Sequence, residues 1–254
     1  MKVLAIDTST PLGSVALVAD GQVRAEIAAS VQARHGRVLL PHVELVLSRA
    51  GVAPEEVDLF AVGIGPGSFT GVRVGVATAK GLALATGRPL RGVISLGALA
   101  RGLGAAPFAV PVVDAHRGEV FAAAFCAPEG ALGDPVVAPF HAPPEEAGRR
   151  LRAVLGPGLA VLCGDGLRRY EEPFCAALGG PFRLAPPLLD PPRAAVVAQL
   201  AEEDFARDGP SDLAALEPLY LRPSDAKLPA EPLVVDGPAP VPQEPDPARG
   251  AGGG

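Results

Sequence analysis

The segment Gly63-Ile-Gly-Pro-Gly-Ser-Phe-Thr-Gly-Val-Arg73 decides how this chain folds. An apolar strand predicted over Leu59–Ile64 runs into it, and a long helix predicted over Phe69–Thr86 follows it. Glycines at such a turn let backbone N–H groups point inward, and the helix start adds a positive dipole end. Either an anion or another stretch of backbone can lie there. The segment is neither a P-loop nor a dinucleotide fingerprint, because the lysine and the third glycine are missing.

The helix predicted over Phe69–Thr86 has an unusually small-residue surface, formed by Gly71, Gly75, Ala77, Ala79, Gly81, Ala83 and Ala85. A glycine in mid-helix costs up to about 1 kcal/mol relative to alanine. We therefore expect another backbone, from this chain or from a partner, to come close to Gly75 and Gly81. We expect these small residues to leave a shallow groove that a partner's helices fill.

The two halves of the chain follow one plan of strand, Asp turn, hairpin, helix, strand, Gly-rich turn and helix. Asp7 and Asp114 end the first strands of the halves, 107 positions apart. This weak repeat predicts an N-terminal lobe over residues 1–104 and a C-terminal lobe over residues 105–223. Both Asp turns would face a cleft, because open α/β sheets bind ligands at the carboxyl ends of their strands. Residues 224–254, rich in Pro and Gly, are predicted to be a disordered tail.

Composition excludes several classes of protein. The net charge is −6 and aromatic residues make up 4% of the chain, which argues against a pervasive nucleic-acid-binding surface or a base-stacking platform. Three isolated cysteines with no CxxC pair argue against a disulfide framework. No apolar run is long enough to span a membrane, and the N-terminus has no signal-peptide pattern. We expect a cytoplasmic protein that does not bind membranes.

Three stretches in order along the chain resemble the TsaB family of bacterial tRNA threonylcarbamoyladenosine biosynthesis proteins. They are Leu4-Ala-Ile-Asp-Thr-Ser-Thr10, the run from Gly63 to Leu82, and Val113-Asp-Ala-His-Arg-Gly-Glu-Val120. Pro218-Leu-Tyr-Leu-Arg222 extends the resemblance toward the C-terminus. The resemblance implies an α/β fold of two ribonuclease-H-like lobes, as in the actin, Hsp70 and sugar-kinase superfamily.

The resemblance also implies a noncatalytic scaffold subunit that binds a TsaD-type transferase, with a TsaE-type ATPase joining the complex. The complex modifies the adenosine next to the anticodon, and this subunit would meet tRNA only through the complex. TsaD-type proteins carry a His-x-x-x-His metal pair. Here Leu39 stands four positions after His35, and His42 follows at seven, so we expect no metal site. A homodimer is expected when the subunit is alone.

Two residue sets follow from these interpretations. The first is the docking face on the helices predicted over Gly36–Ala50 and Phe69–Thr86: Val38, Leu39, His42, Leu45, Gly71, Val74, Gly75 and Thr78. The second is a vestigial nucleotide site in which the first turn could hold hydrated Mg²⁺ and phosphate oxygens: Asp7, Thr8, Ser9, Gly65, Gly67, Ser68, Asp114 and Gly164. No cofactor is expected to be required, and weak nucleotide binding stays open. The alternative is an ATP-dependent phosphotransferase working between Asp7 and Asp114. A metalloprotease is not supported, since the chain has no HExxH motif.

Overall fold

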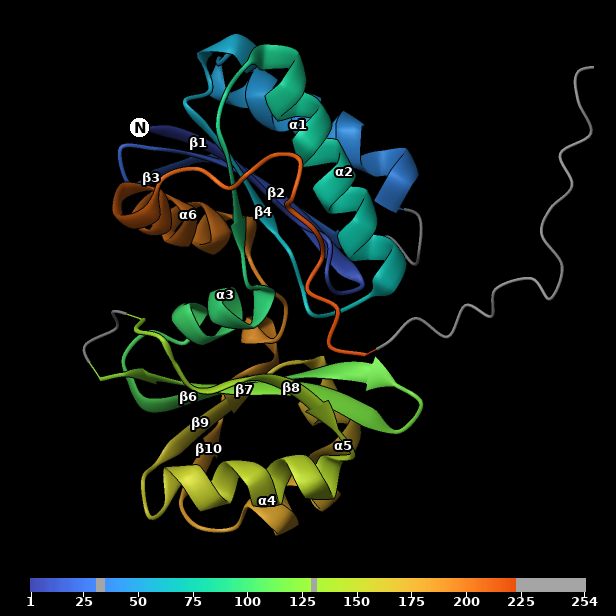
Figure 1. The fold of residues 1–254 in the computed structure, drawn as a ribbon, viewed down its shortest axis with the longest axis vertical. Coiled ribbons are helices and arrows are strands. Elements are labelled where there is room, and N and C mark those ends of the chain that lie inside the picture. The colour runs from blue at the N-terminus through green and yellow to red at the C-terminus, as the bar shows by residue number, and fades with distance from the viewer. Residues whose placement is uncertain (31–34, 129–131, 223–254) are drawn as a thin grey trace, which may run out of the picture. The chain divides into compact units, whose positions relative to one another are not determined.

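A computed structural model describes residues 1–30, 35–128 and 132–222 (Figure 1). The tail predicted over 224–254 lies outside these residues. Two five-stranded mixed sheets form the framework. No helix in the described ranges is long and apolar enough to cross a membrane.

The first sheet has the strand order β3-β2-β1-β4-β5. β1 pairs antiparallel with β2 and parallel with β4, while β2–β3 is antiparallel and β4–β5 parallel. Asp20-Gly21 forms the turn of the β2–β3 hairpin, with both residues at positive φ. The strands are β1 (Lys2–Asp7), β2 (Leu12–Ala19), β3 (Gln22–Ser30), β4 (Leu59–Gly63) and β5 (Leu90–Val93).

The second sheet repeats this topology in the order β8-β7-β6-β9-β10. β6–β7 and β7–β8 are antiparallel, and β6–β9 and β9–β10 are parallel. The repeat predicted from the two Asp turns is therefore confirmed. Its two outer strands were not predicted, and both lie at sheet edges. The strands are β6 (Ala106–His116), β7 (Glu119–Ala127), β8 (Pro135–Ala142), β9 (Ala160–Cys163) and β10 (Phe182–Leu184).

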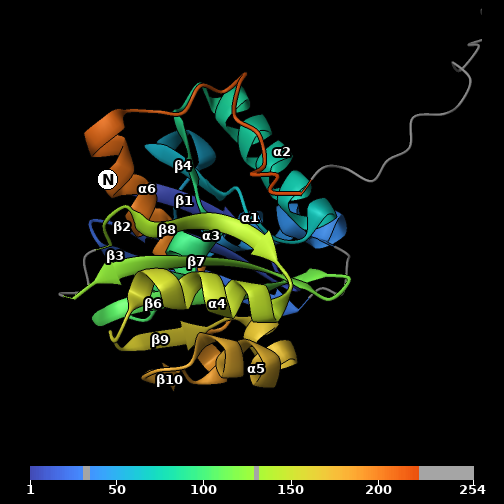
Figure 2. The ribbon, with the colours of Figure 1, turned by 60° about the horizontal axis from the view of Figure 1, so that its bottom comes forward.

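Helices cover both faces of the first sheet because its central strands are buried on both sides. In β1, Leu4 and Ile6 pack toward α1 and α2, whereas Val3 and Ala5 pack toward α6. α4 and α5 contact one another on the outer face of the second sheet (Figures 1 and 2). The helices are α1 (His35–Ala50), α2 (Phe69–Thr86), α3 (Ser95–Gly102), α4 (Pro144–Leu155), α5 (Asp165–Leu178) and α6 (Ala194–Asp208), with short 3₁₀ turns η1 (Pro54–Glu56) and η2 (Pro187–Leu189).

The core between the sheets is built around α3. Leu96 and Leu99 of α3 are buried with Phe121 and Phe125 of β7. α6 departs from the boundaries predicted from the sequence, which assigned residues 105–223 to the C-terminal lobe. Val197 and Ala198 of α6 belong to the core of the first sheet, so the chain returns to the first lobe after completing the second.

Two glycines of α2 allow that helix to lie against the turn that follows β1. A Cβ at Gly71 would lie 2.1 Å from the carbonyl oxygen of Thr8, and one at Gly75 would lie 2.3 Å from Thr8 Oγ1. Both glycines are buried. The expectation that they line an open groove for a partner is therefore wrong, because the chain's own turn fills that space. A Cβ at Gly81, in contrast, would meet nothing within 4 Å.

This difference predicts opposite effects of alanine at two positions of one helix. Gly75→Ala should lower the free energy of unfolding by about 1–3 kcal/mol, since the new methyl group overlaps Thr8. Gly81→Ala, the matched control, should raise it by about 0.5–1 kcal/mol through helix propensity. Urea unfolding followed by circular dichroism measures both. Equal effects of the two substitutions would contradict the close approach.

Candidate functional site

The first Asp turn is buried and hydrogen-bonded within the chain. The Asp7 carboxylate accepts hydrogen bonds from Ser9 N at 2.9 Å, Ser9 Oγ at 2.7 Å and Ser95 Oγ at 2.7 Å. Asp7 has no exposed surface, and a Cβ at Gly63 would overlap its Oδ2. Burial raises the pKa of the Asp7 carboxyl, against the lowering effect of the serine hydrogen bonds. The expectation that Asp7 is an accessible ligand of hydrated Mg²⁺ is not supported by this arrangement.

The Gly-rich segment after β4 holds another backbone rather than an open anion cradle. Ser68 N donates to the carbonyl oxygen of Ser9 at 2.7 Å, and a Cβ at Gly67 would lie 2.2 Å from the same oxygen. Thr8 Oγ1 donates to the carbonyl oxygen of Gly71 at 2.7 Å. The sequence left open whether an anion or another stretch of backbone lies against this segment. In the structure, the backbone of the first turn lies there.

Two further amides of this segment, those of Gly65 and Gly71, also bond to the chain itself. Gly65 N donates to Ser95 Oγ at 3.1 Å, and Gly71 N donates to the N-cap side chain of Ser68 at 3.2 Å. N–H groups that already have partners are poor anion ligands, because a phosphate would have to displace an existing bond. Thr8, Gly65 and Gly67 are thus placed where they join the turn to α2.

The second Asp turn is partly open. Asp114 accepts hydrogen bonds from His116 N at 2.8 Å and from Arg169 Nη1 at 2.8 Å. Gly164 is not available to a ligand, because its N–H donates to Asp190 Oδ1 at 2.9 Å and its α-carbon lies against the carbonyl of Val112. Asp114 itself faces a cavity.

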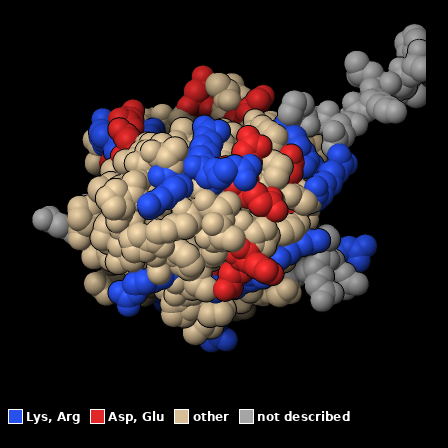
Figure 3. Space-filling model, turned by 90° about the horizontal axis from the view of Figure 1, so that it is seen from below, with Lys and Arg blue, Asp and Glu red and all other residues tan. Residues whose placement is uncertain are grey.

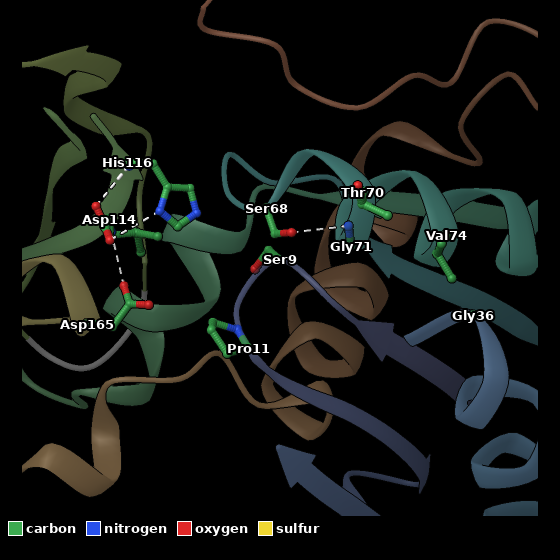
Figure 4. Close-up of a pocket in the computed structure, with 11 residues that line it drawn as sticks. Ser9, Pro11, Gly36, Ser68, Thr70, Gly71, Val74, Asp114, His116 and Asp165 are labelled. Atoms are coloured by element: carbon green, nitrogen blue, oxygen red, sulfur yellow. Dashed lines mark hydrogen bonds and ion pairs between the residues drawn. The ribbon is translucent and has the colours of Figure 1, made fainter. Parts of the chain in front are cut away.

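That cavity, of about 530 Å³, lies between the two turns (Figure 4). Of the predicted nucleotide residues it brings together Ser9, Ser68 and Asp114, whereas Asp7, Thr8, Gly65, Gly67 and Gly164 do not line it. Of the predicted docking residues, Gly71 and Val74 contribute to its wall. Sequence reasoning missed six lining residues: Pro11, Gly36, Thr70, Val113, His116 and Asp165.

The electrostatics of the cavity oppose an unaccompanied phosphate. Asp165 Oδ1 accepts a hydrogen bond from Asp114 N at 3.1 Å, which brings two carboxylates to one wall. Burial raises the pKa of Asp165, and the negative charges of Asp114 and Asp190 act in the same direction. Arg169 is the cation paired with Asp114. Among the described residues, no group of three or more His, Cys, Asp or Glu side chains is arranged to hold a metal ion.

The predicted docking residues divide into two groups. Leu39 is 4% exposed and belongs to the core under α1, so its assignment as a partner contact is wrong, as it is for Gly71 and Gly75. Val38, His42, Val74 and Thr78 are half-buried, and Leu45 is 44% exposed. Val38, His42 and Leu45 recur at intervals of four and three, which places them on one face of α1. α1 contacts α2.

The raised pKa of Asp7 predicts how an Asn substitution will change the pH dependence of stability. Above the unfolded value of 3.8, the native state retains this proton more tightly than the unfolded chain, so Asp7 lowers stability as pH rises toward its folded pKa. The stability of wild type relative to Asp7→Asn should therefore fall over that interval. Urea unfolding of both proteins from pH 4 to pH 7 tests this. A constant or rising difference would disagree with a desolvated carboxyl.

Comparison with known proteins finds a matching family model and similar curated proteins. A sequence model of the family described as TsaD, tRNA N6-adenosine threonylcarbamoyltransferase, matches residues 22–146. The chain is 33% identical over 236 residues to the tRNA threonylcarbamoyladenosine biosynthesis protein TsaB of Escherichia coli, covering 91% of this chain and 100% of that protein. It is 38% identical over 122 residues to TsaB of Bacillus subtilis, covering 48% of this chain and 53% of that protein.

A solved structure agrees with the sequence relatives. YeaZ from Pseudomonas aeruginosa superposes with a TM-score of 0.75 at 30% identity, over 87% of this chain and 99% of that one. The likeness to the E. coli protein extends over the whole length of that protein. The chain belongs to the TsaB family of tRNA threonylcarbamoyladenosine biosynthesis proteins.

Proposed function

We propose that this protein is a noncatalytic subunit that binds a TsaD-type transferase through α1 and α2, with a TsaE-type ATPase joining the assembly. The observation that carries the proposal is that the Asp7 turn and the Gly-rich segment, where a nucleotide was expected to bind, are hydrogen-bonded within the chain. The Asp7 carboxylate accepts three hydrogen bonds from serines. In the Gly-rich segment, the amides of Gly65, Ser68 and Gly71 bond to Ser95, Ser9 and Ser68. A reaction at this turn would first have to break these contacts.

The face of α1 and α2 that points away from the sheet supports the docking role. Leu45 is exposed, and four further residues are half-buried: Val38 and His42 on α1, and Val74 and Thr78 on α2. Apolar groups of this kind supply buried area when a second helix packs on them. Gly81 has open space where a side chain would stand, so a partner can approach the α2 backbone there. The same face serves a homodimer when the subunit is alone.

Charge distribution supports leaving the tRNA contacts to the partner. On the face formed by α4 and α5, arginines and acidic side chains are mixed rather than gathered by sign (Figure 3). With a net charge of −6, this subunit offers little of the phosphate neutralisation that sustains nucleic-acid binding. No cofactor is required for such a role, and localisation in the cytoplasm, where tRNA is modified, belongs to the same proposal.

Two leucines of α1 provide a matched test of the docking face. Leu45 and Leu40 are 44% and 51% exposed, and they lie about 140° apart around the helix. Leu45→Glu should abolish co-purification with the TsaD-type subunit of the same organism and shift the isolated protein to a monomer in light scattering. Leu40→Glu should bind like wild type, and both variants should unfold at wild-type temperatures. Equal binding by the two variants, or an equal loss of binding, would contradict the assignment of this face as the docking surface.

The phosphotransferase alternative is tested with Mg-ATP. The cavity wall contributed by Asp114 and Asp165 is the feature that favours that alternative. Isothermal titration calorimetry should show no tight stoichiometric binding of Mg-ATP, and phosphate release should stay at the level of buffer. Tight binding with turnover, both lost in Asp114→Asn, would replace the scaffold role with an enzymatic one.

A further inference from the structure

Phe69, Arg73 and Tyr220 form an exposed cluster that the docking residues named above do not include. The Arg73 guanidinium lies 3.6 Å from the centre of the Phe69 ring and 5.5 Å from that of Tyr220. Arg73 Nε donates a hydrogen bond of 2.7 Å to Tyr220 Oη, and the two rings lie 5.6 Å apart. Phe69 is 46% and Tyr220 45% exposed. Such a cluster places a cation and two aromatic rings at the surface together.

The C-terminal segment 209–222, which we call the strap, fixes Tyr220 in this position. The strap runs beside α2 (Figure 1). Leu219 N donates to the carbonyl of Ile64 at 2.8 Å, and Lys80 Nζ donates to the carbonyls of Ala214 and Leu216 at 3.3 and 3.2 Å. The strap residues that precede Tyr220 are thus bonded to α2 and to the residue that follows β4. Arg73 is held in one orientation before any partner arrives, which lowers the entropy lost on binding.

The charges around Arg73 leave its outer edge unneutralised. α2 contains Arg73 and Lys80 and no carboxylate. Among the described residues, the strap carboxylates Asp212 and Glu217 form no ion pair with Arg73. The two terminal nitrogens of Arg73 likewise have no hydrogen-bond partner in the described part of the chain. Nε donates to Tyr220, and the two terminal nitrogens remain able to donate two parallel hydrogen bonds to one carboxylate.

We infer that Phe69, Arg73 and Tyr220 form an anchor for a carboxylate side chain set in an apolar surface of the partner subunit. This inference rests on the proposed function and adds to it the chemistry that the partner must present. Arginine and aromatic residues dominate binding energy at protein interfaces, where the rings exclude water from the ion pair.

A protein carboxylate fits this cluster better than an RNA phosphate does. Lys80, the neighbouring cation on α2, directs its ammonium group to two carbonyls of the strap, so the cluster presents a single guanidinium rather than a row of cations. Nucleic-acid binding relies on several phosphate contacts at once. One guanidinium flanked by apolar rings matches a single carboxylate on a protein surface.

The test measures the affinity of the full-length chain for the TsaD-type subunit of the same organism by calorimetry at two salt concentrations. Arg73→Ala should weaken binding about 10- to 100-fold and reduce its dependence on salt. Arg73→Lys keeps the positive charge but lacks the two parallel N–H donors of the guanidinium, and it should recover only part of the affinity. Tyr220→Phe keeps the ring but releases Nε, and should weaken binding by a smaller factor. Arg183→Ala, an exposed arginine on β10, is the matched control and should bind like wild type.

The possible results separate this inference from the proposed function. Unchanged affinity of Arg73→Ala and Tyr220→Phe, alongside loss in Leu45→Glu, overturns the anchor and leaves the docking face standing. A wild-type chain that does not bind the transferase overturns both. Anisotropy with a labelled tRNA transcript tests the other class of ligand. If Arg73→Ala weakens tRNA binding while its affinity for the transferase is unchanged, the cluster binds nucleic acid, and the inference of a carboxylate anchor is wrong.

Discussion

The carbonyl groups of Thr8 and Ser9 lie against the backbone of Gly71 and Gly67, and the architecture of the first lobe depends on this contact. It fixes the end of β1 to the start of α2, because Ser68 N and Thr8 Oγ1 each donate across it. Any side chain at either glycine would separate the two segments. The same contact uses the polar groups that an Asp turn and a Gly-rich turn would otherwise offer to a ligand, so the packing constraint has a functional consequence.

Much of the fold could be predicted from the sequence because its signals are local. The helix over Phe69–Thr86 begins after a Ser N-cap and ends at Gly87 in the left-handed region, which is why its limits were predicted correctly. β8 was missed because prolines interrupt its alternation, and β10 because it has three residues, all exposed. The docking of α6 on the first sheet could not be predicted, since its small apolar residues fit either lobe.

The candidate site was harder to predict, because residue types alone do not show which neighbour each residue contacts. Gly71, Gly75 and Leu39 were recognised as residues that permit or form a close contact, but the sequence does not show whether the neighbour is a partner or the chain's own turn. Asp165 stands between Gly164 and Gly166, a signal that could have placed it beside Asp114. The pairing of Arg73 with Tyr220 joins residues 147 positions apart, and no local pattern indicates it.

The first turn of this molecule is closed on itself, and we therefore propose that partner contacts lie on α1, α2 and the strap instead. Native-state hydrogen exchange of the Ser9 and Ser68 amides measures that closure most directly. The account predicts protection close to the free energy of global unfolding, unchanged by Mg-ATP. Rapid exchange in the free protein, or protection that appears only when Mg-ATP is added, would show an open nucleotide site and contradict it.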